Sequence, residues 1–157
     1  MPPFIVELLS RDHIRAVYPL ILEAIPGLSL NAWLRFARGA TASRRDPKTG
    51  IVVARREGHD FPSGLFCYRV ERDPANARVL VAEHFVAVDL LHPGDVLAAL
   101  AAELDELARR TGCTAIRSIV RRPDVAGGLT QAGHAAEGSL LGKVLTDGKT
   151  APTGGGA

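Results

Sequence analysis

A strand-to-helix junction in the middle of the chain carries the residues best placed to bind an anion. The run from Val79 to Val88 is rich in β-branched apolar residues, which indicates a buried strand. It ends before His92-Pro93-Gly94-Asp95, and leucines then recur at helical spacing from Leu97 to Leu107. The first turn of a helix offers N–H groups without intrahelical partners and the positive end of the helix dipole. This junction is therefore a candidate site for the anionic part of a ligand.

Glu83 and His84 are adjacent titratable residues within that strand. Neighbouring side chains of a strand point to opposite faces, so we expect only one of the two to reach a cleft. Both also fit a half-exposed strand with polar residues on its solvent face, and this plainer interpretation stays open. His13, His59 and His134 have no neighbour at metal-ligand spacing, so we expect no zinc site.

A basic region covers the end of the second predicted helix, the following loop and the next strand. It fits a binding surface for a phosphorylated ligand or, more plainly, a solvated helix end and loop. Aromatic residues make up only 5% of the chain, which argues against a stacking platform for single-stranded nucleic acid. The residues are Arg35, Arg38, Arg44, Arg45, Lys48, Arg55 and Arg56, with a smaller anion site at Arg117, Arg121 and Arg122.

Length and composition indicate one globular domain over residues 1–145. The chain has 157 residues, a net charge of +2 and two cysteines, and it can bury a substantial core without disulfides or a metal. We expect a cytoplasmic protein because no signal peptide or apolar run of about 20 residues is present. The glycine-rich segment 146–157 is expected to be disordered.

The pattern along the chain predicts an α/β fold. Strands are expected at 4–9, 51–55, 65–71, 78–88, 114–120 and 138–145, and helices at 10–25, from 29 to just before 39, at 94–110 and at 124–132. Pro19 should kink or divide the first helix, and Ser29 should cap the second. Short turns favour an antiparallel meander of strands two to four, and the crossover helix makes strands four and five parallel. The expected result is a mixed sheet of about six strands flanked by about four helices on both faces.

This order resembles the GNAT superfamily of N-acetyltransferases over residues 4–145. Tyr18-Pro19-Leu20 and Pro26-Gly27-Leu28-Ser29 are similar to the two-helix segment on the substrate side of that family. The long fourth strand and the helix that ends at Thr111-Gly112-Cys113 have the family's spacing. The segment from Leu129 to His134 is similar to its closing motif. The resemblance implies a GNAT-like fold and the transfer of an acyl group from an acyl-coenzyme A to an amine.

The chain departs from the family where the chemistry is expected. Family members hold the coenzyme A diphosphate on an Arg/Gln-x-x-Gly-x-Gly/Ala loop, whereas here His92 stands first and Asp95 and Leu97 replace the two small residues. We expect Asp95 to satisfy the N–H groups that a phosphate would use. At about 4 Å and an effective dielectric near 20, a carboxylate beside one phosphate charge costs about 4 kcal/mol. Leu129 stands where the family often has a tyrosine that protonates the leaving thiolate, and leucine cannot donate a proton. The loop is therefore interpreted as degenerate.

The resemblance also implies which residues would form the site. Glu83 is the candidate general base, and His84 is the alternative. The pantetheine arm of acetyl-coenzyme A, or of another acyl-coenzyme A, would lie along the fourth strand in a gap between strands four and five. The residues implied to contact the coenzyme are Val86, Val88, His92, Gly94 and Val96.

Two functions follow from the sequence. The first is an acyltransferase that acts on a small-molecule or protein amine, with no metal. The alternative is a catalytically inactive GNAT-fold module with a binding or regulatory role, which has lost the diphosphate site. Nucleic acid and membranes are not expected partners, and a homodimer is left open.

Overall fold

A mixed sheet forms the centre of the computed structural model, which describes residues 4–42 and 48–146. Its strands lie in chain order, β1-β2-β3-β4-β5. The pairs from β1 to β4 are antiparallel, and β4 and β5 are parallel, as the sequence predicts. The bounds are β1 Phe4–Leu8, β2 Thr49–Arg56, β3 Pro62–Asp73, β4 Ala77–Ala87 and β5 Ala115–Ser118.

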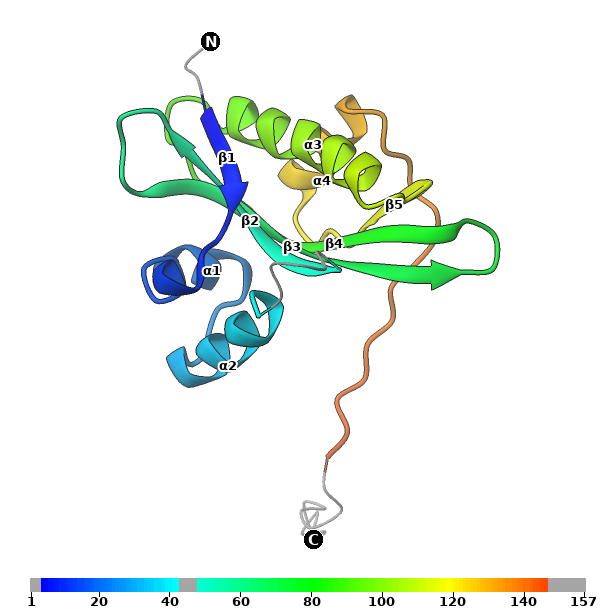
Figure 1. Ribbon diagram of the computed structural model, residues 1–157, viewed down its shortest axis with the longest axis horizontal. Helices are drawn as coiled ribbons and strands as arrows, with labels where there is room; N and C mark the ends of the chain where they lie inside the picture. Colours follow the sequence, from blue (N-terminus) through cyan, green and yellow to red (C-terminus); the bar gives the residue numbers. More distant parts are fainter. Residues whose placement is uncertain (1–3, 43–47, 147–157) are drawn as a thin grey trace, which may run out of the picture.

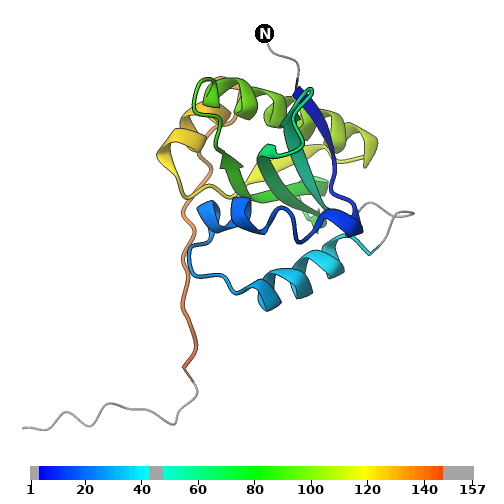
Figure 2. The same cartoon turned by 90° about the vertical axis from the view of Figure 1, so that its left-hand side faces the viewer.

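Two pairs of helices cover the two faces of the sheet (Figure 1). The first pair is α1 Tyr18–Ala24 and α2 Leu30–Ala40, and the second is α3 Pro93–Arg110 and α4 Pro123–Gln131. Turning the molecule by 90° shows the sheet between these two layers (Figure 2). Among the described residues, no helix combines the length and hydropathy needed to cross a membrane.

The sheet divides the interior into two cores because its side chains alternate between the faces. On β2, Val52 and Ala54 pack in the core beneath α3 and α4. Ile51 and Val53 pack in the core beneath α1 and α2, where Trp33 is almost fully buried. The Trp33 indole N–H donates a hydrogen bond of 2.8 Å to the carbonyl of Ile14, which ties α2 to the segment before α1.

Pro19 divides the first predicted helix rather than kinking it. The described chain forms a 3₁₀ turn at Arg11–His13 and then the helix α1, which begins at Tyr18 with Pro19 in its first turn. A proline is tolerated there because the missing N–H would have no intrahelical partner. The predicted cap of α2 is confirmed, since the Ser29 hydroxyl accepts a hydrogen bond of 3.1 Å from the N–H of Ala32.

The prediction of a sixth strand at residues 138–145 is wrong. The chain there is extended but belongs to no ladder, so the sheet of the described residues has five strands. Leu140, Leu141, Val144 and Leu145 are exposed, because no sheet or helix in the described ranges covers them. The predicted disorder of the tail concerns residues that, apart from Thr146, lie outside the described ranges.

One of the two adjacent glycines in α4, Gly128, lies where the helix packs closely against α3. A Cβ atom at position 128 would lie 2.0 Å from Cδ2 of Leu97 on α3, whereas a Cβ at position 127 would meet nothing within 4 Å. Leu97 is buried, as its apolar side chain predicts. The helix-breaking tendency of Gly128 is therefore accepted in return for close contact between α3 and α4.

We expect opposite effects from alanine at these two glycines. Gly128→Ala should lower the free energy of unfolding by about 1–3 kcal/mol, because Leu97 must move within a packed core. Gly127→Ala should raise it by about 0.5–1 kcal/mol through helix propensity alone. Urea denaturation of both variants checks this, and equal effects of the two changes would contradict the contact.

Candidate active site where two parallel strands separate

The ladder between β4 and β5 is short and ends beside a small pocket. Residues Val79–Ala82 pair with Ala115–Ser118, and the last bond runs from the Ile119 N–H to the Ala82 carbonyl, at 2.8 Å. Beyond this point β4 and the segment that follows β5 separate. The pocket between them has a volume of about 30 Å³, room for about one or two water molecules. Its walls include Glu83–Phe85 of β4, residues 119–122, Ala24 of α1 and Val125 of α4.

A β-bulge in β4 turns both candidate bases into this pocket. Cys67 of β3 pairs with Glu83 and Leu65 pairs with Val86, so that two residues of β4 lie opposite one residue of β3. His84 has a φ of 60°, in the left-handed region that residues other than glycine seldom adopt. The expectation that only one of Glu83 and His84 reaches a cleft is therefore wrong, because the extra residue breaks the alternation of the strand.

Glu83 lies in a chain of charges on the face toward α1 and α2. Its Oε1 accepts a hydrogen bond of 2.6 Å from Nη1 of Arg69, and the Nε of Arg69 is 2.5 Å from Oε1 of Glu71. Cys67, opposite Glu83, is buried. Burial first, and then the charge of Glu83, raise the pKa of the Cys67 thiol to about 12. Cys67 is therefore a protonated core residue and no nucleophile.

His84 is half-buried and lies between an acidic and two basic groups. Its Nε2 is 3.7 Å from Oε2 of Glu83. Burial lowers the pKa of His84 below its ordinary value of 6.5, Glu83 opposes that effect, and Arg121 and Arg69 add to it. At neutral pH the imidazole is therefore uncharged and can accept a proton.

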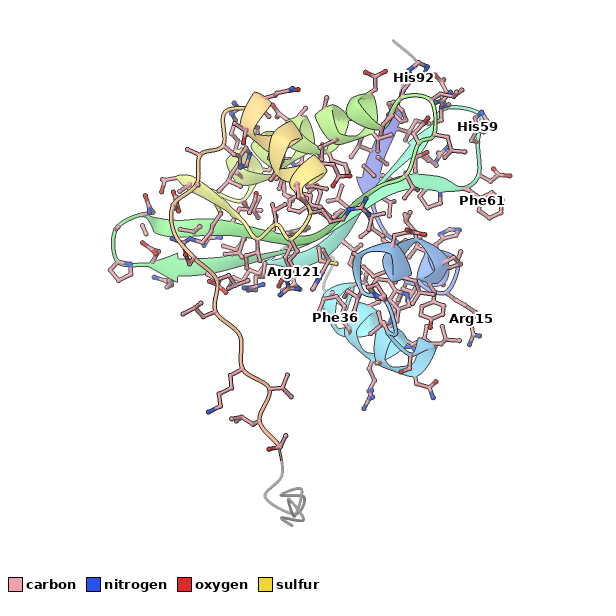
Figure 3. The ribbon with its side chains drawn as sticks, turned by 180° about the vertical axis from the view of Figure 1, so that it is seen from behind. Arg15, Phe36, His59, Phe61, His92 and Arg121 are labelled. Carbon is pink, nitrogen blue, oxygen red and sulfur yellow. The ribbon has the colours of Figure 1, made fainter. Side chains whose placement is uncertain are left out.

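The helical pair α1–α2 meets this site at two places, because Ala24 of α1 lines the pocket and Phe36 of α2 packs against His84. The Phe36 ring meets the His84 ring edge to face, with the ring centroids 6.2 Å apart. Phe36 is exposed, and Figure 3 shows it with Arg121 where the helical pair approaches the sheet. Of the smaller anion site predicted at Arg117, Arg121 and Arg122, only Arg121 and Arg122 line this pocket. The sequence pointed to Arg121, but nothing in it marked Phe36 or Arg69.

The loop between β4 and α3 is held by Asp89 rather than by Asp95. Oδ1 of Asp89 accepts hydrogen bonds of 2.9 Å from the N–H groups of both Leu91 and His92, and Oδ2 pairs with Arg56. The Asp89 side chain is only 7% exposed. The bond from His92, and then the bond from Arg56, lower the pKa of the carboxyl to about 2. An internal carboxylate therefore occupies two N–H groups of this loop.

The expectation that Asp95 caps the loop is wrong. No side-chain cap bond is found at the start of α3, and Oδ2 of Asp95 is 3.9 Å from Nδ1 of the exposed His92. Val96 is fully buried in the core, so only its backbone could meet a ligand. Nothing lies within 4 Å of a Cβ built at Gly94, so the backbone there is open to solvent.

The backbone of β4 that is free to meet a ligand differs from the predicted positions. The N–H of Val88 donates a bond of 2.8 Å to the carbonyl of Ser63, next to β3, so Val88 faces away from the gap. Since backbone direction alternates along a strand, Val86 also faces β3. Ala87, which lies between Val86 and Val88, then presents its N–H and carbonyl groups on the side of the gap. No group of side chains suited to a metal ion is found in the described residues.

The charges around His84 predict how its pKa responds to substitution. Glu83→Gln should lower the pKa of His84 further, because the carboxylate opposes the effect of burial. Arg121→Ala should raise it, because a nearby positive charge disfavours the imidazolium. An NMR titration of the His84 ring in both variants measures these shifts, and shifts of the opposite signs would contradict this arrangement.

Asp89 should contribute more to stability than Asp95. The pKa of Asp89 is about 2, below its ordinary 3.8, so its stabilisation is complete above pH 3.8 and is lost as the pH falls toward 2. Asp89→Asn should lower the unfolding free energy at pH 7 and weaken its fall between pH 4 and pH 2. Asp95→Asn is the matched control and should do neither. Urea denaturation across this pH range decides, and a larger effect at Asp95 would contradict the assignment.

Comparison with known proteins gives a match of fold alone. No family model matches the chain, and no curated protein matches it. The aminoglycoside acetyltransferase AAC(6')-Iy, in complex with the bisubstrate analogue CoA-S-monomethyl-acetylneamine, has a TM-score of 0.73 and 15% identity. That match covers 92% of this chain and 99% of the other chain.

Two further solved structures agree with this match. Ribosomal-protein-alanine N-acetyltransferase from Brucella melitensis biovar Abortus 2308 has a TM-score of 0.69 and 17% identity, covering 91% of this chain and 100% of its own. A transcriptional regulator from Bacillus halodurans C-125 has a TM-score of 0.74 and 13% identity, with the same two coverages of 91% and 100%. The mixed sheet with a layer of helices on each face is thus a known architecture: the chain has the GNAT acetyltransferase fold.

Proposed function

We propose that this chain is an N-acyltransferase that takes an acyl group from an acyl-coenzyme A, such as acetyl-coenzyme A, and transfers it to an amine. The observation that carries the proposal is the bulge in β4, which places Glu83 and His84 together in the pocket where β4 and β5 separate. The acetyltransferases of the same fold, one of them solved with the bisubstrate analogue CoA-S-monomethyl-acetylneamine, support the reaction class.

His84 is the best-placed proton acceptor in this site. An amine attacks as its free base, so a protonated amine must first lose a proton. The sequence favours Glu83 as the general base, but its carboxylate already accepts a hydrogen bond from Arg69. His84 is uncharged at neutral pH and has Glu83 3.7 Å away, where the carboxylate stabilises the imidazolium that forms. We therefore assign the proton transfer to His84 and the electrostatic support to Glu83.

The site fits the pantetheine arm of an acyl-coenzyme A better than it fits the diphosphate. The backbone of Ala87 faces the gap and is the group on β4 that we assign to the pantetheine arm. The loop before α3 fits less well, because the Asp89 carboxylate accepts the N–H groups of Leu91 and His92 where the loop begins and places a negative charge there. A diphosphate must either displace Asp89 or use other groups. We therefore expect weak binding of the coenzyme.

The second candidate is a binding or regulatory module without acyl transfer. Two observations favour it: the occupied loop, and Leu129, which is 2% exposed and offers no proton at the position of the family's tyrosine. The structural likeness to a transcriptional regulator is consistent with a role other than catalysis. Binding of acetyl-coenzyme A and turnover distinguish this candidate from the first.

Thermal unfolding with acetyl-coenzyme A tests the proposal. A ligand at 100 times its Kd stabilises the folded state by about 2.7 kcal/mol, which is visible as a rise in Tm. We expect a rise in the wild type at millimolar ligand and a larger ligand-induced rise in Asp89→Asn, whose side chain carries no charge against the diphosphate. The control Asp95→Asn should behave like the wild type.

Turnover separates the two candidates. Release of free thiol from acetyl-coenzyme A in the presence of a panel of amines should be lost in His84→Gln and reduced in Glu83→Gln. If neither the wild type nor Asp89→Asn is stabilised by the coenzyme, the acyltransferase is refuted. Stabilisation without thiol release for any amine would favour the inactive module.

A further inference from the structure

One arginine that lines the pocket beside β4 has no carboxylate partner in the described parts of the chain. Glu83 is bound by Arg69, and Arg122 turns back to Asp124, with its Nε 3.2 Å from Oδ1 and its Nη2 3.1 Å from Oδ2. Arg121 lines the same pocket, yet it takes part in none of the ion pairs found among the described residues. Its exposed guanidinium is therefore left to solvent or to a ligand.

Arg121 and Phe36 lie around the same imidazole. Figure 3 shows them where the helical pair approaches the sheet, Arg121 from the sheet side and Phe36 from α2. The Phe36 ring packs edge to face against the ring of His84, and Arg121 is near enough for its charge to lower the pKa of that ring. A positive charge and an apolar ring thus flank the group that we assign to proton transfer.

The charges of this pocket are of both signs and lie close together. Oε2 of Glu83 is 3.7 Å from Nε2 of His84, and the pocket that these residues share with Arg121 has a volume of about 30 Å³. A molecule that brings an amine to His84 therefore has little room to keep its other groups away from Arg121. A second positive charge would be repelled there, whereas a carboxylate or a phosphate would gain charge-assisted hydrogen bonds.

We propose that the acyl acceptor is a small amine that carries an anionic group, a carboxylate or a phosphate, a few bonds from its nitrogen, and that Arg121 binds this anionic group. This inference rests on the acyl transfer proposed above. The planar guanidinium of Arg121 matches two oxygen atoms of the anion, and Phe36 contacts the carbon atoms of the acceptor. Amines without an anionic group, polyamines included, are poor acceptors.

The transfer step then needs no group beyond the two substrates and His84. The free amine attacks the thioester carbonyl, the new C–N bond forms and the C–S bond breaks. The nitrogen gives one proton to His84, and the thiolate leaves with the electron pair of the C–S bond and takes up a proton from water. The products are an amide that keeps its anionic group and the free thiol of the coenzyme.

Two matched pairs of amines test the role of the anionic group. L-Phenylalanine and phenethylamine differ by a carboxylate, and phosphoethanolamine and ethanolamine differ by a phosphate. In thiol release from acetyl-coenzyme A, we expect the anionic member of one pair to have the lower KM and the higher kcat/KM. The pair that shows this preference identifies the anion as carboxylate or phosphate. Because the amines also differ in their own pKa values, each preference is compared between the wild type and variants.

Substitution of Arg121 should abolish this preference. Arg121→Ala should reduce it about 10- to 100-fold, through KM of the anionic amine, because a hydrogen bond to a charged group is lost. Arg121→Lys should restore part of it, since the charge returns without the forked geometry. Arg15→Ala is the matched control and should keep the preference, because Arg15 lies on the opposite side of the helical pair (Figure 3).

The outcomes separate this inference from the proposed function. Equal use of both members of each pair, or a preference that survives in Arg121→Ala, would overturn the inference while the acyl transfer stands. Absence of thiol release with every amine would refute the acyl transfer, and with it the role of the anionic amine as acceptor. An NMR signal of His84 that moves with the anionic amine in the wild type, and not in Arg121→Ala, would still assign ligand binding to Arg121.

Discussion

The bulge at His84 is the feature on which the rest of the site depends. In a regular strand, the side chains of Glu83 and His84 would lie on opposite faces of the sheet. The hydrogen bonds of β4 to β3 and to β5 would also continue in register along the whole strand. The extra residue brings both side chains to one face. It also coincides with the end of the β4–β5 ladder at Ala82. One irregularity thus accompanies both the opening of the sheet and the titratable pair beside it.

The strain at His84 is held by contacts on several sides. A positive φ at a residue other than glycine costs of order 1–3 kcal/mol and persists only where the surroundings fix it. Phe36 packs against the ring, Glu83 lies beside Nε2, and Val86 returns the strand to the buried core next to Leu65. Such sites store strain where geometry serves function. This agrees with placing proton transfer at His84.

Most of the fold could be predicted from local patterns in the sequence, whereas the site could not. β-branched runs and leucine spacing located the five strands and the four helices, together with a sixth strand that does not form. Ser29 marked the start of α2, and Pro19 marked the division of the first predicted helix. The bulge leaves no signal in a run such as Ala82–Phe85, because it arises from pairing with β3. The part played by Asp89 was missed for a similar reason: its partner Arg56 is 33 residues away in the chain, and no spacing rule connects them. The sequence favours Asp95 as the capping residue only because Asp95 stands in the first turn of α3.

The pocket beside β4 and the groove beside β5 both result from the shortness of β5. Only four residue pairs join β5 to β4, and past Ser118 the chain turns toward α4 instead of continuing along the sheet. On the inner side this leaves the pocket at Glu83 and His84. On the outer side it leaves a groove whose far wall is chain that forms no ladder. The wall of the pocket at residues 119–122 therefore begins where this one short strand ends.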